Sequence, residues 1–564
     1  MHTEVPSRYG SALARFGFWF SIFLTVAPLA DAWALFDNGG HISRQLATGK
    51  FVDAAGKSDE TVFLAWQGDG SAPNEVTLWA YCGSGDCPPA DEDPSCQQPN
   101  PPSCAGVVPV KCQDPQGCDY RWKVQLPGSL GFDKSFSPPV TASSAEFGER
   151  VYVATRQTNN TGRVYSFDAC GNCQWAYDPL VALDGGNTTA KKNTVKNGFY
   201  AAPTVHDFTD AGGQKKRVLF AVSWAAETGT AHLHSIKGEG FSGEEGARYR
   251  DAIKVAGTGY HRPVVDETCG CVGAAGACDK AAYPRVYVGV VGGDPGAGLY
   301  AVDTLSGDAY EVTLAGYENP QFRFGGTILP LGGKRYLLSN LELQQGSIAI
   351  ALPEAGACGS MATPAVITDV QTAPGVKATH RTRPVVIYED ETPVVYLAQK
   401  EDGPGGLIHR FEPNAGPPAT VFNLPAENWP WPAACDSVQL DSMSWSTPGF
   451  HPYNASLMFG TVKDVGSGVL RVPIDDPCVS TPTDPFFFYR PRDGWRSEGV
   501  FTDKGRRFHV GSSFDLVYTL EAEARSCPVV DWCYDMGADA GGRCFVGSQP
   551  NPGCCSASSE LGAP

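Results

Sequence analysis

A repeated pair of apolar strands, the second of which opens on a glycine, constrains this chain more than any other feature. In the clearest copies, residues 150–154 precede the glycine-led strand 162–168, and residues 285–289 precede the glycine-led strand 298–303. Self-similarity of this kind is typical of stacked folds, because each unit has an apolar face that only its neighbours can bury. The sequence therefore predicts an array of similar units.

The first strand of each unit tends to follow a proline, and these positions give a period of about 60 residues. They are Pro139-Val140, Pro203-Thr204, Pro263-Val264, Pro384-Val385 and Pro448-Gly449. The widest interval, from Pro263 to Pro384, contains one further unit, whose first strand we place at Thr327. The glycine that opens the third strand recurs in step, and we expect it to take the positive φ of a tight hairpin: Gly162, Gly229, Gly298, Gly346, Gly406 and Gly468. Less regular units flank the array, at 61–66 with 75–80 and at 507–511 with 516–520.

Each unit offers three or four short strands with no amphipathic helix between them, which is typical of a blade of antiparallel sheet. We therefore predict an all-β fold, a single β-propeller of seven or eight four-stranded blades over residues 35–525. A parallel solenoid would have much shorter coils, and immunoglobulin-like sandwiches run to about 100 residues without the repeated proline and glycine. The best candidates for fourth strands are 120–124 and 174–177.

One unit carries a motif beyond its strand pattern, in Val151-Tyr-Val-Ala154, Gly162 to Asp168, Gly171 and Trp175. This succession resembles the PQQ-like repeat β-propellers, the superfamily that includes quinoprotein alcohol dehydrogenases. A second copy runs from Val286 through Asp303 and Gly307, with Tyr310 at the tryptophan position. The resemblance covers roughly residues 35 to 525, and it implies that Trp175 packs one blade against the next.

Enzymes of that superfamily hold a quinone and a calcium ion over the propeller axis with carboxylates, an amide and a vicinal disulfide. Those ligands cannot be placed in this sequence, and its vicinal pair, Cys554-Cys555, lies in the tail and not in the blades. We therefore expect no cofactor, with PQQ or calcium as the alternative.

The N-terminus has the three parts of a secretory signal: Arg8 and Arg15, the apolar run 16–30, and alanines at positions 30, 32 and 34. An apolar run of about 15 residues falls short of the roughly 20 that a membrane-spanning helix needs. We expect residues 1–34 to be a signal peptide, with cleavage after Ala32 or Ala34, and no membrane span in the mature chain.

Cysteine usage agrees with export, because all 19 cysteines follow the signal and many cluster in an insertion at 82–118 and a tail at 526–564. In an oxidising compartment we expect them to form disulfides, with Cys170 and Cys173 as a local staple, and the odd total leaves at least one without a partner in the chain. The disulfide candidates are Cys82, Cys87, Cys112, Cys118, Cys170, Cys173, Cys527, Cys533, Cys544, Cys554 and Cys555. Three sequons predict glycosylation, at Asn159, Asn187 and Asn454.

Two weak candidates for a metal site stand out. His232 and His234 share one face of a strand, but no third ligand is visible, so we expect both to face solvent. Acidic residues also follow first strands but lack the spacing of a calcium loop, so we expect them to solvate turns: Asp207, Asp210, Asp266, Glu389, Asp390 and Glu391.

The net charge of −18, without a cluster of Lys and Arg, argues against nucleic acid as a partner. The sequence favours a secreted, non-catalytic propeller that binds an extracellular protein or glycan through its loops. The alternative is a secreted quinone- or metal-dependent oxidoreductase.

Overall fold

The structure is a computed structural model, and its described residues are nearly all in β-strands and turns. They are 33–34, 41–42, 46–52, 58–67, 76–83, 101–112, 120–127, 129–130, 137–157, 162–179, 198–225, 230–257, 259, 261–271, 278–292, 297–314, 320–322, 325–341, 347–354, 358, 366–370, 384–389, 392–400, 406–411, 449–451, 456–460, 468–473, 487–489, 499–502, 507–511, 517–521, 545–546 and 549–550.

Antiparallel sheets follow one another along the chain and are named here by their inner strand. The β9 sheet contains β9 (Val140–Ser144), β10 (Gly148–Gln157), β11 (Gly162–Asp168) and β12 (Cys173–Tyr177), with β8 (Ser129–Leu130) also paired to β10. The β13 sheet contains β13 (Thr204–Thr209), β14 (Lys215–Ala225), β15 (Thr230–Lys237) and β16 (Arg248–Ala256). The β17 sheet contains β17 (Val264–Asp266), β18 (Arg285–Val290), β19 (Gly298–Asp303) and β20 (Ala309–Val312).

The next three sheets repeat this order. The β21 sheet contains β21 (Thr327–Leu331), β22 (Lys334–Asn340), β23 (Ser347–Ala351) and β24 (Val366–Val370). The β25 sheet contains β25 (Val385–Glu389), β26 (Thr392–Lys400) and β27 (Gly406–Phe411). The β28 sheet contains β28 (Gly449–His451), β29 (Ser456–Gly460), β30 (Gly468–Pro473) and β31 (Phe487–Tyr489).

The two ends of the array depart from the repeat. The β3 sheet contains β3 (Ala47–Val52), β4 (Ser58–Gln67), β5 (Val76–Cys82), β7 (Trp122–Gln125), β6 (Pro109–Lys111) and β2 (His41–Ile42), and the short 3-10 helix η2 (Pro102–Cys104) precedes β6. The β32 sheet contains β32 (Val500–Thr502), β33 (Arg507–Gly511), β34 (Val517–Glu521) and, from the N-terminal part of the chain, β1 (Trp33–Ala34). Strands β35 (Phe545–Val546) and β36 (Gln549–Pro550) pair with each other.

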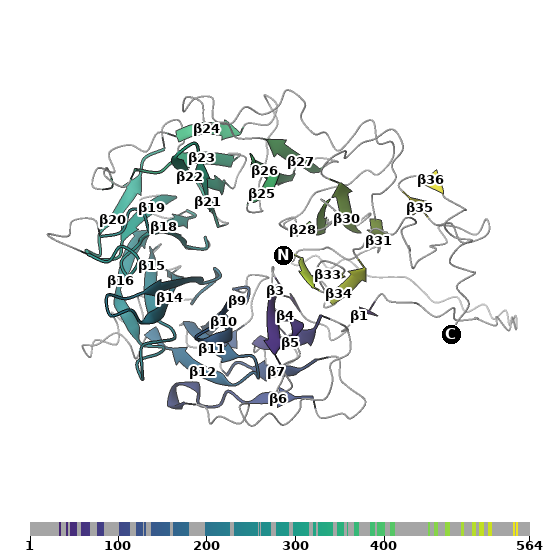
Figure 1. The fold of residues 1–564 in the computed structure, drawn as a ribbon, viewed down its shortest axis with the longest axis horizontal. Coiled ribbons are helices and arrows are strands. Elements are labelled where there is room, and N and C mark those ends of the chain that lie inside the picture. The colour runs from purple at the N-terminus through teal and green to yellow at the C-terminus, as the bar shows by residue number, and fades with distance from the viewer. Residues whose placement is uncertain are drawn as a thin grey trace, which may run out of the picture.

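Figure 1 shows the sheets succeeding one another around a common centre, which makes the fold β-propeller-like. Inner strands of neighbouring sheets are in contact, as β3 is with β9, β13 with β17, β17 with β21, and β21 with β25. At the junction of the two ends, β32 contacts both β3 and β4. The Thr502 hydroxyl donates a hydrogen bond of 3.2 Å to the Gly83 carbonyl across this junction.

The hydrophobic core lies between neighbouring sheets. One cluster joins Trp175 and Tyr152 of the β9 sheet to Phe199, Leu219 and Ile236 of the next unit, and similar clusters join the β13 sheet to the β17 sheet and the β17 sheet to the β21 sheet. The inter-sheet packing expected of Trp175 is therefore confirmed, and a buried aromatic of this size contributes about 1.5–3 kcal/mol. Tyr310 does not share this role, because it is 40% exposed, whereas Val312 on the same strand is buried in the cluster.

The first strands begin at the predicted residues, and the third strands begin at the recurring glycine or one residue later. The reason given for that glycine is wrong at Gly162 and Gly298, since neither has a positive φ. At Gly162 a Cβ would lie 2.5 Å from the Phe199 ring and 2.7 Å from the Thr155 carbonyl, so close packing requires the glycine. At Gly298 the atom nearest to an added Cβ would be 3.6 Å away, so close packing does not require the glycine there.

Candidate functional site: a carboxylate between two arginines

An arginine stands near the start of the second strand in several sheets. Each of these arginines lies directly before the apolar part of its strand: Arg150 in β10, Arg217 in β14, Arg285 in β18 and Arg335 in β22. The side chains of Arg217 and Arg285 are fully buried. Because a buried guanidinium without acceptors is strongly unfavourable, the fold must supply carboxylates or carbonyls to each of them.

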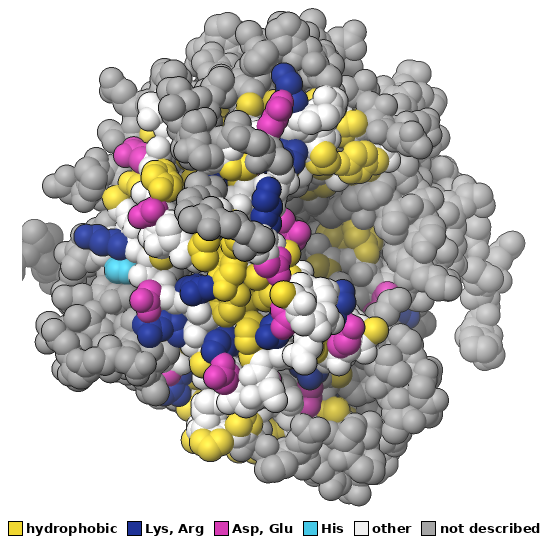
Figure 2. Space-filling view, turned by 60° about the vertical axis from the view of Figure 1, so that its left-hand side comes forward, with side chains coloured by type: hydrophobic (Ala, Val, Ile, Leu, Met, Phe, Trp, Pro, Cys, Tyr) yellow, Lys and Arg dark blue, Asp and Glu magenta, His cyan; other side chains and the backbone are white. Residues whose placement is uncertain are grey.

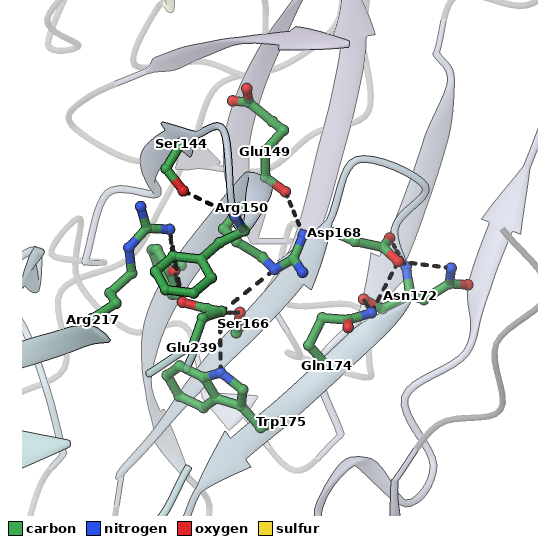
Figure 3. A network of polar contacts seen from close by, with 12 residues as sticks. Ser144, Glu149, Arg150, Ser166, Asp168, Asn172, Gln174, Trp175, Arg217 and Glu239 are labelled. Carbon is green, nitrogen blue, oxygen red and sulfur yellow. Dashed lines mark hydrogen bonds and ion pairs between the residues drawn. The ribbon is translucent and has the colours of Figure 1, made fainter. Parts of the chain in front are cut away.

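Glu239 supplies the central carboxylate between the β9 and β13 sheets (Figure 3). It lies in the connection between β15 and β16 and is 7% exposed. Its carboxylate accepts hydrogen bonds from the Tyr152 hydroxyl (2.5 Å), the Ser166 hydroxyl (3.0 Å) and the Trp175 indole N–H (3.2 Å). All three donors belong to the β9 sheet, so this carboxylate joins one sheet to the next.

The two arginines approach the same carboxylate from different sides (Figure 3). Arg150 Nε lies 3.5 Å and Arg217 Nη1 lies 3.7 Å from its oxygens. Arg217 also donates two hydrogen bonds to Asp207, of 2.6 and 2.7 Å, and packs over the Phe147 ring. The site therefore places two carboxylates, Glu239 and Asp207, against two guanidinium groups.

The electrostatics of this site indicate a structural role for Tyr152 and not a role in proton transfer. Burial raises the pKa of Tyr152 well above its usual value, and the nearby negative charge of Glu239 raises it further. The tyrosine therefore stays protonated and remains a donor to the carboxylate. Since the Glu239 carboxylate receives three hydrogen bonds from the β9 sheet and lies near both arginines, the arrangement acts as a clamp between two sheets.

The interface between the β17 and β21 sheets has the same framework but a different clamp. Arg285 and Tyr287 stand where Arg150 and Tyr152 do in the earlier unit, and Pro353 follows β23 as Glu239 follows β15. Here the disulfide Cys269–Cys358 joins the two sheets. The Cys358 carbonyl accepts a hydrogen bond of 2.9 Å from Arg285.

Arg335 completes this second clamp. It forms an ion pair with Asp266 and donates a hydrogen bond of 2.6 Å to the Pro353 carbonyl. Asp266 does hold a turn, since it accepts a hydrogen bond of 3.1 Å from the Thr268 N–H, but it is only 2% exposed and also pairs with Arg335. Asp207 likewise serves Arg217. Asp210 does hold a turn, accepting hydrogen bonds from the backbone N–H groups of Gly212 and Gln214.

The histidine pair does not face solvent as a pair, which corrects the sequence-based expectation. His234 is fully buried between the Tyr177 hydroxyl, 3.0 Å from Nδ1, and the Ser223 hydroxyl, 2.9 Å from Nε2, and burial holds its pKa well below the usual value. His232 is partly buried, and burial lowers its pKa to about 4. Within the described part of the chain, no three His, Cys, Asp or Glu side chains are grouped to hold a metal ion.

Ser223 and His234 have the distance of a nucleophile and its base, but both are 0% exposed. A serine nucleophile must reach a substrate carbonyl, and this one is fully buried. The pair therefore stabilises the interior of the β13 sheet.

The disulfides differ from the predicted pairing. Cys173 pairs with Cys104 of the 82–118 insertion and not with Cys170, so this bond joins the β3 sheet to the β9 sheet. Cys271 pairs with Cys278 within one loop, and Cys82, Cys112 and Cys170 are also disulfide-bonded. The remaining candidates and the sequons lie outside the described residues: Cys87, Cys118, Cys527, Cys533, Cys544, Cys554, Cys555, Asn159, Asn187 and Asn454.

Sequence reasoning missed the arginines and Glu239. The arginines recur at one position of the repeat, and that alignment was the signal that could have found them. Glu239 lies two residues after the third strand, where the β21 sheet has Pro353, so no recurring residue type in the sequence marks it.

Comparison with known proteins gives no family for this chain. No protein-family model matches it, and no curated protein matches it. Among solved structures it is similar to dihydro-heme d1 dehydrogenase NirN, with 10% identity and a TM-score of 0.37 over 83% of this chain and 74% of that one. It is also similar to the Pseudomonas aeruginosa periplasmic gluconolactonase PpgL, with 12% identity and a TM-score of 0.35 over 76% of this chain and 99% of that one.

A third similar structure is the C-terminal domain of Pseudomonas aeruginosa PilY1, with 10% identity and a TM-score of 0.35 over 68% of this chain and 93% of that one. At TM-scores this low, the likenesses assign neither a family nor an activity to this chain. In the described residues, no helix has the length and apolar character needed to cross a membrane.

Proposed function

We propose that this chain is a secreted β-propeller of eight blades that binds an extracellular protein or glycan and catalyses no reaction. The observation that carries the proposal is the way neighbouring sheets are joined. Disulfides Cys104–Cys173 and Cys269–Cys358 each cross from one sheet to the next. Such bonds persist in oxidising compartments and are rare in the cytosol.

The repeat supports a PQQ-like origin without the quinone site. Asp168 accepts hydrogen bonds of 2.9 Å from the N–H groups of Cys170 and Asn172, in a turn where Gly171 has a φ of 80°. Asp303 and Gly307, with a φ of 82°, repeat this turn in the β17 sheet. These recurring polar residues hold turns in both sheets, which is a structural role.

The described surface is consistent with a protein or glycan partner. Figure 2 shows basic and acidic side chains intermingled around exposed apolar ones on one face, without a large area of a single charge. Val108 and Val110, 67% and 51% exposed, add apolar surface at the outer strand β6. A mixed surface is compatible with protein recognition, because interfaces are about as apolar as the rest of a protein surface, whereas nucleic acid requires a basic stripe.

The test is to express the full chain in a eukaryotic secretory host and to analyse protein recovered from the medium. We expect a spectrum without a quinone band, no stoichiometric metal, and saturable binding to members of a panel of purified glycans and extracellular proteins. A bound quinone or one metal ion per chain would instead support the alternative, a secreted quinone- or metal-dependent oxidoreductase. Retention of the chain inside the cell would contradict secretion.

A further inference from the structure

The fourth strand of the β32 sheet does not come from the unit that builds the rest of that sheet. In the β9, β13, β17, β21 and β28 sheets the outer strand follows directly along the chain from the third. In the β32 sheet the outer position beside β34 is held by β1, from the opposite end of the chain (Figure 1). The two ends of the array are therefore joined by backbone pairing.

The register of the pairing between β1 and β34 shows which residues form the outer edge of the β32 sheet. Trp33 lies opposite Thr519 and Ala34 opposite Tyr518. Farther along the chain, β35 and β36 pair with each other and leave this edge to β1. The inner strand β32 meets the β3 sheet independently, through the hydrogen bond from Thr502 to Gly83. The junction is thus held at its inner strand by side-chain contacts and at its outer edge by β1.

The leader overlaps this strand. Two pairs of alanines satisfy the small-residue rule for signal cleavage: Ala30 with Ala32, and Ala32 with Ala34. Cleavage after Ala34 would remove both residues that pair with β34, whereas cleavage after Ala32 leaves both in place. Only the first pair of alanines is compatible with the strand pairing of the folded chain.

We propose that the chain is processed after Ala32, so that Trp33 becomes the first residue of the mature protein and the first residue of the strand that closes the array. The inference rests on the secretion proposed above. Water hydrolyses the Ala32–Trp33 amide in the signal peptidase, which leaves a carboxylate on Ala32 and an α-amino group on Trp33. Processing and closure are then linked, because the cut that releases the leader creates the end of the closing strand.

The first experiment determines the N-terminus of protein secreted from the full chain, by Edman sequencing and by intact mass after deglycosylation. Trp33 as the first residue is the expected result. Leu35 as the first residue would overturn the inference while leaving secretion intact. An intracellular chain that begins at Met1 would overturn secretion, and this inference with it.

A matched pair of chains tests the role of the strand separately from its processing. One chain begins at Trp33 and the other at Leu35, and each is fused directly to the same unrelated leader. Because the second lacks both ladder residues, we expect it to have a lower melting temperature and faster proteolysis within 517–521. Equal melting temperatures and equal proteolysis would show that β1 does not close the array.

The variant Ala34→Leu gives a further check on the site. It removes the small residue required for cleavage after position 34 and leaves the Ala30 and Ala32 pair intact. The secreted variant should still begin at Trp33. A shifted or blocked N-terminus would show that the natural cut uses Ala34, contrary to the proposal.

Discussion

Replacing Glu239 by glutamine tests the clamp between the β9 and β13 sheets. Glutamine keeps the shape and one acceptor oxygen but loses the charge that lies 3.5 Å from Arg150 and 3.7 Å from Arg217. Removing one partner of a buried ion pair typically costs about 3–5 kcal/mol. Arg217 keeps both hydrogen bonds to Asp207, and Arg150 is 19% exposed to water, so we expect the lower end, about 3 kcal/mol.

Glu239→Ala should cost more than Glu239→Gln. It also leaves the Tyr152 hydroxyl, the Ser166 hydroxyl and the Trp175 indole N–H without their acceptor, and each unsatisfied buried donor costs about 1–3 kcal/mol. The assay is urea unfolding followed by tryptophan fluorescence, to which Trp175 of this interface contributes as one of the chain's 12 tryptophans. A change in midpoint at constant slope measures the loss of stability.

The matched control is Glu244→Gln in the same connection. Glu244 pairs with Lys237, but its side chain is 62% exposed, so the change should leave the midpoint where it is. Glu239→Gln and Tyr152→Phe should also be non-additive, because their side chains share a hydrogen bond. If Glu239→Gln matched Glu244→Gln in stability, the buried carboxylate would not be a clamp and the reasoning would be refuted.

Three further predictions follow from other parts of the fold. Gly162→Ala should destabilise the fold by about 1–3 kcal/mol, because the added Cβ would overlap Phe199. Gly298→Ala is the control and should be nearly neutral in the same unfolding assay, because the atom nearest to its Cβ would lie 3.6 Å away. Equal effects of the two changes would contradict the packing argument. His261 is fully buried, and burial lowers its pKa to about 3. Below about pH 6.5 this histidine therefore takes up a proton in the unfolded chain but not in the folded chain. The stability of the fold should fall as the pH drops from about 6.5 toward 3. His261→Asn should make that fall shallower by up to about 1.4 kcal/mol per pH unit, and an unchanged slope in unfolding measured across this range would exclude the histidine as its source. Removing the residues after Ser526 should leave the melting temperature of the array unchanged in calorimetry, because β1 and not the tail completes the β32 sheet, and a loss of folding would contradict this.

The strands were predictable because they depend on a local pattern that repeats. A proline fixes the entry to the inner strand, and alternating apolar residues define the next two, so the start of β13 at Thr204 and of β17 at Val264 could be read directly. The fourth strands β7 and β12 also lie where the aromatic residues indicated. These features require only information within one unit.

The exposure of individual side chains was not predictable in the same way. Alternation along a strand indicates solvent on one face only when one face of the sheet is free. Here both faces of a sheet lie against neighbours, so His234 is buried although it shares the polar pattern of His232. The same geometry explains why Arg217, a residue type normally at the surface, is 0% exposed.

The pairing of distant residues was the least predictable feature. Cys170 and Cys173 are close in sequence, yet Cys173 bonds to Cys104, 69 residues away, because the insertion of the β3 sheet lies against β12. Glu239 meets Arg150 for the same reason, since each comes from a different sheet. Such contacts depend on how units are placed beside one another, which the pattern within a unit does not record.

The clamps between sheets also bear on how a chain of units with similar strand patterns assembles in the right order. Units that share strand patterns can exchange neighbours during folding, which is a common failure of repeat proteins. In the folded chain Cys104 pairs with Cys173, Cys269 pairs with Cys358, and Glu239 lies near Arg150 and Arg217. These three junctions thus differ in the contacts that hold them, so a unit placed beside the wrong neighbour would leave the cysteines reduced or mispaired and a buried charge uncompensated.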